Sequence, residues 1–181
     1  MGGNINESCL DAARRIVSAL KEKDEFRLQF LSSLDQKTYE QLGLWFKGAA
    51  CDSVTRGGFI KRLREADILL LPHGFKGGRS REEYETIFPT RTIEYLLSGK
   101  PILAHTPRGA FLTTFLKENQ CALVIEEESE VAIREGVERL RNDDDFRCRL
   151  VRNALLAARM FRSEKVIGHL RSVVLGATTR V

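Results

Sequence analysis

Apolar and polar positions follow two periods along this chain, one typical of helices and one typical of short strands. Apolar residues recur every three or four positions from Glu7 to Lys23, which predicts an amphipathic helix. Phe26, Leu28 and Phe30 alternate with other residues, so a strand is expected over Phe26–Leu31. The next elements expected are a helix over Gln36–Gly43, a strand over Leu44–Lys47 and a helix over Gly58–Ala66.

From Ile68 onwards, short apolar runs alternate with helical patterns. Ile68 opens a buried strand, and a polar, glycine-containing loop is expected from Gly74 to Phe88. The elements expected next are a helix over Thr90–Ser98, a strand over Pro101–His105, a helix over Ala110–Asn119, a strand over Cys121–Ile125, and helices over Glu130–Leu140, Phe146–Phe161 and Ser163–Leu175. The expected fold class is therefore α/β: a single Rossmann-like, doubly wound parallel sheet with helices on both faces and a helical C-terminal tail.

The start of the chain departs from this layout. A doubly wound sheet usually opens with a strand before its first glycine loop, whereas Gly2 and Gly3 follow the first methionine directly. We therefore expect residues 1–181 to be one domain of a longer protein, without its first strand. A native chain whose first strand is displaced is the alternative.

Composition narrows the class of protein. With 181 residues, 43% of them hydrophobic and 30% charged, the chain fits one globular domain. Its four cysteines form no Cys-x-x-Cys pair, which argues against a zinc cluster or a disulfide framework and indicates a reducing, cytoplasmic compartment. No apolar run approaches the roughly 20 residues that span a bilayer. The net charge of +4 is scattered among acidic runs, so nucleic acid is not expected as a partner, while a small anionic ligand stays open.

The segment from Phe88 to Glu94 carries the main candidate site. Ligands of open α/β sheets bind beyond the carboxyl ends of the strands, where helix N-termini offer amide groups to anions. Thr90 is a candidate N-cap, and Pro89 fixes the chain that enters the helix. Glu94, one turn further, could accept two hydroxyl groups from one sugar ring. The alternative is that Glu94 only stabilises the first turn through the helix dipole, by about 0.3 to 1 kcal/mol.

Several segments together resemble a known family. They are Ala66–Pro72, Phe88–Leu96, Ser98–Ala104, Ala122–Ile125, Glu138–Leu140 and Phe161–Val166. This combination resembles the C-terminal half of a family 4 retaining glycosyltransferase with the GT-B fold. The resemblance covers about Ala66 to Leu175, whereas the first third of the chain matches only in layout.

The resemblance implies a function. The domain would hold the nucleotide half of a sugar nucleotide, and the enzyme would transfer a hexose to a glycan or lipid-linked acceptor with retention of configuration. UDP-glucose is the expected donor, because it is frequent in the family. The acceptor would bind a missing N-terminal domain, so this domain alone is expected to be inactive. No cofactor and no metal are expected, since the sequence has no metal-binding motif.

The resemblance also implies roles for two glutamate positions. Glu94 matches the second of the family's two glutamates, which binds the ribose hydroxyls. The position of the first, which contacts the donor sugar, is occupied by Thr86. Glu85 is adjacent and is therefore the candidate for the sugar contact, with Thr86 as a further substrate-binding residue. A solvated loop carboxylate is the alternative role for Glu85.

The diphosphate site departs from the family pattern. The loop from Gly2 to Glu7 lacks the family's arginine and lysine, although Gly3 could let the backbone approach a phosphate. The cations near the expected site are Lys76, Arg79, Arg81 and Arg91. Arg91 is the best candidate to stabilise the leaving diphosphate, because it lies on the first turn of the helix.

The remaining candidates concern the base and the rival functions. Gly48 and Ala49 correspond to the family's base-contacting segment, and His73 follows a strand, although such a histidine is more often a structural loop residue.

The rival functions are those of a flavodoxin-like or receiver-like regulatory domain and of a sugar-nucleotide epimerase of GT-B layout. We can assign no residues of this sequence to the acidic cluster that a receiver needs, or to the catalytic histidine and glutamate set that an epimerase needs. Peripheral membrane association of the full-length protein stays open.

Overall fold

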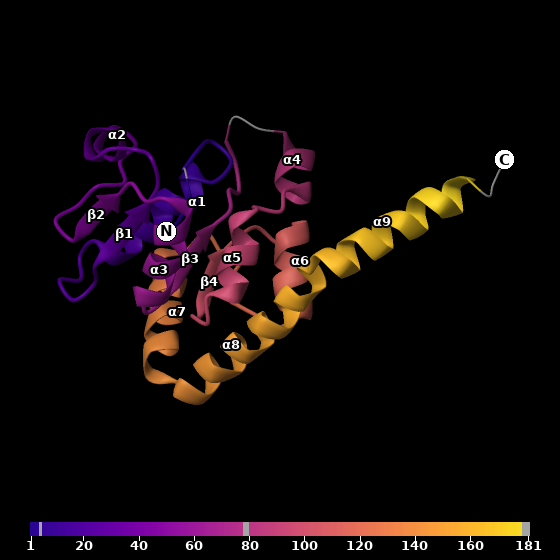
Figure 1. Ribbon diagram of the computed structural model, residues 1–181. Coiled ribbons are helices and arrows are strands. Elements are labelled where there is room, and N and C mark those ends of the chain that lie inside the picture. The colour runs from indigo at the N-terminus through magenta and orange to yellow at the C-terminus, as the bar shows by residue number, and fades with distance from the viewer. Residues whose placement is uncertain (4, 78–79, 179–181) are drawn as a thin grey trace.

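The structure, a computed structural model, describes residues 1–3, 5–77 and 80–178, and its strands alternate with helices along the chain (Figure 1). The strands are β1 (Leu28–Leu31), β2 (Ala49–Asp52), β3 (Leu69–Pro72), β4 (Ile102–His105) and β5 (Leu123–Ile125). The pairings among the described strands are parallel: β1 pairs with β2, and the others follow the order β3-β4-β5. The expected α/β class is therefore confirmed.

The helices pack on both faces of these strands. They are α1 (Leu10–Leu20), α2 (Gln36–Gln41), α3 (Arg56–Glu65), α4 (Arg81–Thr86), α5 (Arg91–Leu97), α6 (Phe111–Glu118), α7 (Glu130–Asn142), α8 (Asp144–Ala158), the 3₁₀ turn η1 (Arg159–Phe161) and α9 (Ser163–Thr178). Helix α1 packs against α7, and α5 packs against α8. These two pairs belong to two separate hydrophobic clusters, one on each face.

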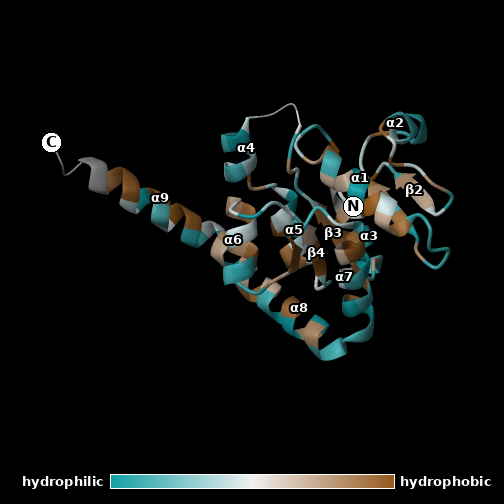
Figure 2. Cartoon of the chain, turned by 180° about the vertical axis from the view of Figure 1, so that it is seen from behind, coloured by the Kyte–Doolittle hydropathy of each residue, from teal (hydrophilic) through white to brown (hydrophobic). Residues whose placement is uncertain are grey.

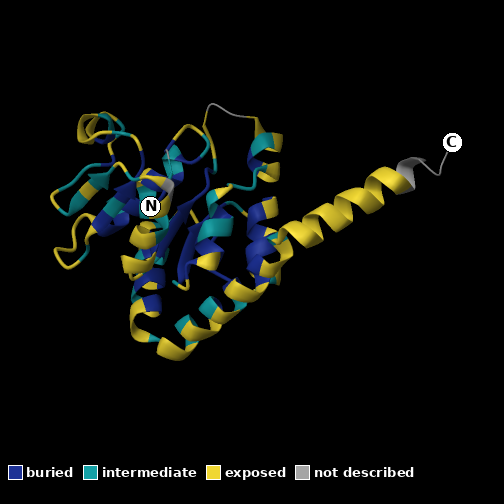
Figure 3. Cartoon of the chain, viewed as in Figure 1, coloured by how far each residue is buried: buried dark blue, intermediate teal, exposed yellow. Residues whose placement is uncertain are grey.

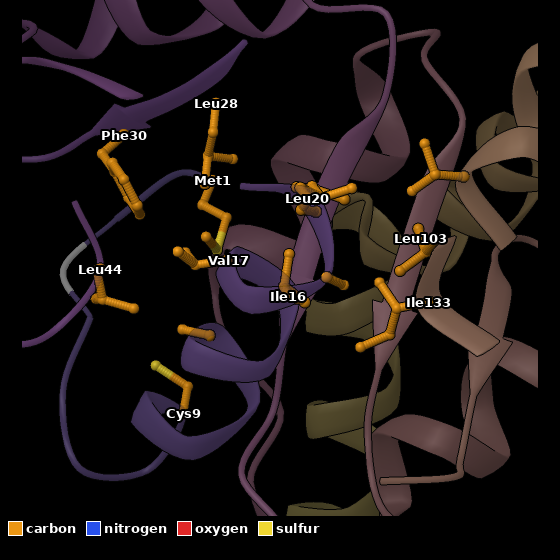
Figure 4. Close-up of a cluster of buried hydrophobic side chains, with 14 of the residues drawn as sticks. Met1, Cys9, Ile16, Val17, Leu20, Leu28, Phe30, Leu44, Leu103 and Ile133 are labelled. Carbon is orange, nitrogen blue, oxygen red and sulfur yellow. The ribbon is translucent and has the colours of Figure 1, made fainter. Parts of the chain in front are cut away.

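Alternation along β3 and β4 explains the two clusters. Leu70 and Leu103 belong to the cluster with α1 and α7, whereas Leu69 and Leu71 belong to the cluster with α3, α5 and α6. Successive side chains of a strand point to opposite faces, so a strand buried on both faces is apolar throughout. Figure 4 shows the first cluster, in which the Met1 side chain lies among residues of α1 and β1. Full burial of a leucine side chain stabilises the fold by about 1.5 to 3 kcal/mol.

The expected strand over Leu44–Lys47 is wrong. Gly43 adopts a left-handed backbone with φ +69° at the end of α2, and the Leu44 amide donates to the Tyr39 carbonyl at 2.9 Å. Leu44 is fully buried in the first cluster, so its apolar character reflects packing of a loop. The strand of this region is β2, which begins at Ala49 instead.

The expected loop between β3 and Phe88 contains a helix that the sequence reasoning missed. In α4 the Ser80 hydroxyl accepts a hydrogen bond from the Glu83 amide at 3.3 Å. A serine followed three residues later by glutamate is a recognised signal for a helix start. The signal was obscured because the helix is only six residues long and entirely polar apart from Tyr84, which is buried.

Helix α9, expected over Ser163–Leu175, is confirmed and projects from the rest of the chain (Figure 1). Its apolar residues alternate with polar ones along its length and its described side chains are exposed (Figures 2 and 3). Its exposed apolar residues include Val166, Ile167, Leu170, Val173 and Val174. Within the described ranges, no helix combines the length and the apolar character that a membrane crossing requires.

Candidate functional site

The glycine turn at the start of the chain meets the first turn of α5. The Gly3 amide donates to the Leu31 carbonyl at 2.8 Å, which holds the turn at the carboxyl end of β1. The Arg91 guanidinium donates to the Gly2 carbonyl. Gly3 has a φ of +77°, and a Cβ atom at this position would lie 3.1 Å from Arg91 Cζ. The positive φ therefore favours glycine here, and any side chain would also crowd the Arg91 guanidinium.

Tyr95 joins this turn to β3. Its hydroxyl accepts a hydrogen bond from the Gly2 amide at 2.6 Å and donates to the Leu70 carbonyl at 3.3 Å. The side chain is completely buried, and burial raises the pKa of its hydroxyl. The sequence reasoning missed this role. The available signal was the four-residue spacing from Arg91, which places the two side chains on one side of the helix.

The first turn of α5 differs from the expectation in one respect. Thr90 was expected to cap the helix, yet its backbone is already helical, with φ −57° and ψ −32°, and its side chain makes no capping hydrogen bond. The Pro89 carbonyl accepts from the Thr92 amide at 2.9 Å. The first hydrogen bond of this turn is therefore accepted by the Pro89 carbonyl, one residue before Thr90. Thr90 is exposed and Pro89 is half-buried.

Glu94 lies in the same turn and is half-buried. Within residues 1–3, 5–77 and 80–178, the structure gives its carboxylate no hydrogen bond and no ion pair. Its spacing of three residues from Arg91 puts both side chains on neighbouring positions of the helix surface. An acceptor group thus lies next to the cation that holds the glycine turn. This arrangement suits a ligand that has both hydroxyl groups and negative charge.

Glu85 and Thr86 lie on α4, and both are exposed. The Glu85 carboxylate pairs with Arg81 Nε at 2.6 Å, and the Thr86 hydroxyl donates to the Glu82 carbonyl at 2.7 Å. These are contacts within one helix. Solvent screens an exposed pair of this kind, so it holds Glu85 only weakly.

His73 has a structural partner. It is 1% exposed, and its Nε2 donates to the Tyr84 carbonyl at 2.7 Å, which ties the end of β3 to α4. Burial lowers the pKa of His73, so the neutral ring is favoured. Because the ring is enclosed by protein, the structure favours the structural role that the sequence left open for His73.

The carboxyl end of β4 is also covered by protein. His105 Nδ1 donates to the Ile125 carbonyl at 3.0 Å, and its Nε2 accepts from Arg15 at 2.7 Å. Arg15 also binds Glu128, at 2.5 Å, and the Phe75 ring lies tilted against His105 with a centroid distance of 4.5 Å. Burial lowers the pKa of His105, with a smaller effect of the same sign from the nearby arginine.

The remaining basic candidates have other partners. Lys76 forms an ion pair with Glu128 at 3.1 Å, and Arg81 pairs with Glu85. Arg79 lies outside the described residues. Among the proposed cations that the structure describes, Arg91 is therefore the one that lies at the glycine turn.

Two further placements differ from the sequence predictions. Phe88 is half-buried and packs against Phe111, Phe115 and Phe161, with ring centroids 5.9, 5.2 and 5.6 Å away, so it lies at the border of the second hydrophobic cluster. Gly48 and Ala49 lie at the amino end of β2, opposite the edge that bears Arg91. Their location was predicted wrongly because the strand was placed five residues too early. No metal-binding group of three or more His, Cys, Asp or Glu residues occurs in the described part of the chain.

No protein-family model matches the sequence, and no curated protein is similar enough in sequence to match it. Solved structures match its fold. Sucrose-phosphate synthase from Thermosynechococcus elongatus superposes with a TM-score of 0.69 at 13% identity, over 97% of this chain and 45% of that one. Anabaena HepE in complex with UDP-glucose gives a TM-score of 0.68 at 13% identity, over 97% and 48%.

A solved single domain matches as well. The C-terminal domain of a group 1 family glycosyltransferase from Francisella tularensis gives a TM-score of 0.57 at 15% identity, over 89% of this chain and 83% of that one. The chain thus has the architecture of one half of a GT-B glycosyltransferase, which confirms the expected fold. It spans about half the length of the two larger proteins.

Proposed function

We propose that the edge formed by Gly2, Gly3, Arg91 and Glu94 binds the nucleoside diphosphate part of a sugar nucleotide. The observation that supports this most directly is the contact between Arg91 and the Gly2 carbonyl, with the Glu94 carboxylate beside it. A glycine turn and a guanidinium group can surround a phosphate, and a carboxylate can accept two adjacent hydroxyl groups of a ribose. UDP-glucose is the proposed donor.

The proposed reaction is transfer of a hexose with retention of configuration. The bond between the anomeric carbon and the diphosphate oxygen breaks, a bond forms between that carbon and the acceptor oxygen, and the proton of the acceptor hydroxyl passes to the departing diphosphate. Arg91 would stabilise the negative charge that develops on the leaving diphosphate, because a fixed cation needs no reorganisation at that moment. Glu94 would orient the nucleotide through its ribose. No metal is needed in this scheme.

Glu85 and Thr86 are proposed to contact the sugar when the donor is bound. Their helix, α4, lies between β3 and α5 in the sequence, so both residues come shortly before Arg91 and Glu94. The weak pair of Glu85 with Arg81 would have to open for this contact. A glycan or lipid-linked acceptor would be bound by a further domain, and a cytoplasmic location fits the four free thiols.

Calorimetry with UDP, GDP and ADP tests the proposal. The wild-type chain should bind UDP, and Glu94→Gln should weaken binding about tenfold or more, because hydrogen bonds to a charged group contribute about 1.5 to 3 kcal/mol. Glu135→Gln is the matched control, since Glu135 is exposed on α7, away from this turn. Absence of binding by all three nucleotides to the folded wild type would contradict the proposal.

A further inference from the structure

The segment that follows β3 lies against the start of α1. The Gly74 amide donates a hydrogen bond to the Ser8 carbonyl at 2.8 Å. A Cβ atom on Gly74 would lie 2.7 Å from the Ser8 oxygen and 2.8 Å from Asp11 Oδ1. Because both distances are too short for a real Cβ atom, this close approach of the two segments favours glycine at position 74.

Asp11, in the first turn of α1, holds the backbone of the next two residues. Its Oδ2 atom accepts hydrogen bonds from the Phe75 amide at 3.0 Å and from the Lys76 amide at 3.3 Å. Its Oδ1 atom is enclosed and has no hydrogen-bond partner among the residues that the structure describes. A buried acceptor without a partner costs free energy, so stability alone does not explain a carboxylate at this place.

Helix α4 is tied to the same two segments. Nε2 of His73, at the end of β3, donates to the Tyr84 carbonyl at 2.7 Å. The Tyr84 hydroxyl donates to the Glu7 carbonyl at 3.3 Å, on the chain that leads from the glycine turn into α1. Tyr84 is buried, whereas its neighbours Glu85 and Thr86 are exposed. The position of these two exposed side chains therefore depends on how the chain after β3 is held against α1.

The Phe75 side chain has contacts of its own. Its ring centroid lies 4.5 Å from that of His105 and 5.1 Å from Arg15 Cζ. These contacts hold the ring at the end of β4. Removal of the Asp11 carboxylate would thus release the backbone of this segment without removing the packing of its aromatic side chain.

We propose that Asp11 is a positioning residue for the sugar of the donor. Its carboxylate fixes the backbone after β3, Tyr84 fixes α4 to the same place, and α4 presents Glu85 and Thr86 to the sugar. Asp11 acts through α4 and does not touch the donor. The inference rests on the proposed function, and in particular on the contact of Glu85 and Thr86 with the sugar.

The affinities for UDP-glucose and for UDP, measured separately by calorimetry, test the inference. Asp11→Ala should weaken UDP-glucose binding about tenfold, as expected for one lost hydrogen bond to a charged group, and should change UDP binding by no more than about twofold. Asp11→Asn should restore the affinity for UDP-glucose, because the amide oxygen of asparagine still accepts from both backbone amides.

Two further variants guard this test. Gly74→Ala disturbs the same contact from the other side, so it should act like Asp11→Ala and replaces it if that variant does not fold. Asp143→Ala is the matched control and should bind both ligands as the wild type does. Asp143 also accepts from a backbone amide, that of Phe146 at 2.9 Å, but at the corner between α7 and α8, far from α4 (Figure 1).

A double-mutant cycle separates positioning from stability. In a chain that carries Glu85→Ala and Thr86→Val, the change Asp11→Ala should no longer alter the affinity for UDP-glucose, because the groups that Asp11 positions are absent. A role in stability alone would change the free energy of unfolding without changing the ratio of the two affinities.

Equal weakening of UDP-glucose and UDP binding in Asp11→Ala would overturn the inference and leave the proposed function standing, as would unchanged binding of both ligands. An effect of Asp11→Ala that persists without the Glu85 and Thr86 side chains would also overturn it. If the folded wild-type chain binds neither ligand, the proposed function fails and the inference fails with it.

Discussion

The Arg91 guanidinium donates a hydrogen bond to the carbonyl oxygen of Gly2, 89 positions earlier in the chain. The glycine turn itself carries no basic residue. The contact brings a cation to that turn from helix α5, at the edge where the strands end. Arg91 is therefore positioned to supply the charge that the turn lacks, and it also holds the turn in place.

Arg91→Lys should weaken UDP binding about tenfold or more. Lysine keeps the charge but has no planar fork that could bind the Gly2 carbonyl and an anion together. Calorimetry at two salt concentrations measures the change. Arg81→Lys, at an exposed position on α4, is the control and should bind UDP as the wild type does. Unchanged affinity in Arg91→Lys would argue against a phosphate contact.

Tyr95→Phe should lower the free energy of unfolding by about 1 to 3 kcal/mol. The change removes the hydroxyl between Gly2 and Leu70 and leaves a buried donor and acceptor without their partner. Urea denaturation measures the loss. Tyr84→Phe is the comparison, because the Tyr84 hydroxyl contacts the Glu7 carbonyl at 3.3 Å in a partly buried place and should lose less. Equal losses in the two variants would contradict a special role for Tyr95.

Phe88→Ala should destabilise the fold by about 2 to 4 kcal/mol and leave nucleotide affinity unchanged. The ring packs among Phe111, Phe115 and Phe161, so its removal opens a cavity in the core. Denaturation gives the stability, and calorimetry on the folded variant gives the affinity. A loss of UDP binding without a loss of stability would contradict this prediction and would mean that Phe88 contacts the nucleotide.

His73 should make stability fall as the solution becomes acidic. Burial lowers its folded-state pKa below the ordinary value of 6.5, so the unfolded chain binds more protons below that pH. The stabilisation is present above about pH 6.5 and is lost as the pH falls through the folded-state pKa. Urea denaturation between pH 7.5 and 5.5 should show a shallower loss for His73→Gln than for wild type.

The matched control for that series is His169→Gln, because His169 is exposed on α9. This variant should follow the wild-type pH dependence. The buried His105 ring and the buried Met1 amine, whose pKa values are also lowered, contribute to the slope that remains in His73→Gln. An unchanged slope in His73→Gln would mean that His73 is protonated at no cost in the folded chain.

Sequence reasoning located most elements because their signals are local. The run from Leu69 to Leu71 identified a strand buried on both faces, and Gly99 followed by Pro101 marked the end of a helix. The errors also have local causes. Leu44 is apolar because a loop packs inward, and α4 is too short and polar to show a helical period.

For the site, the sequence by itself determined the residue types: a glycine turn, an arginine and a glutamate three positions apart, and a proline before them. Only the tertiary structure decided that Arg91 reaches Gly2, that Tyr95 joins the turn to β3, that Phe88 packs against other aromatic rings and that His73 is enclosed by protein. The physical reason is that helix and strand periods depend on neighbours along the chain. The contact between Arg91 and Gly2 spans 89 positions and depends on how the strands align in space. The spacing of apolar residues along the chain does not determine that alignment.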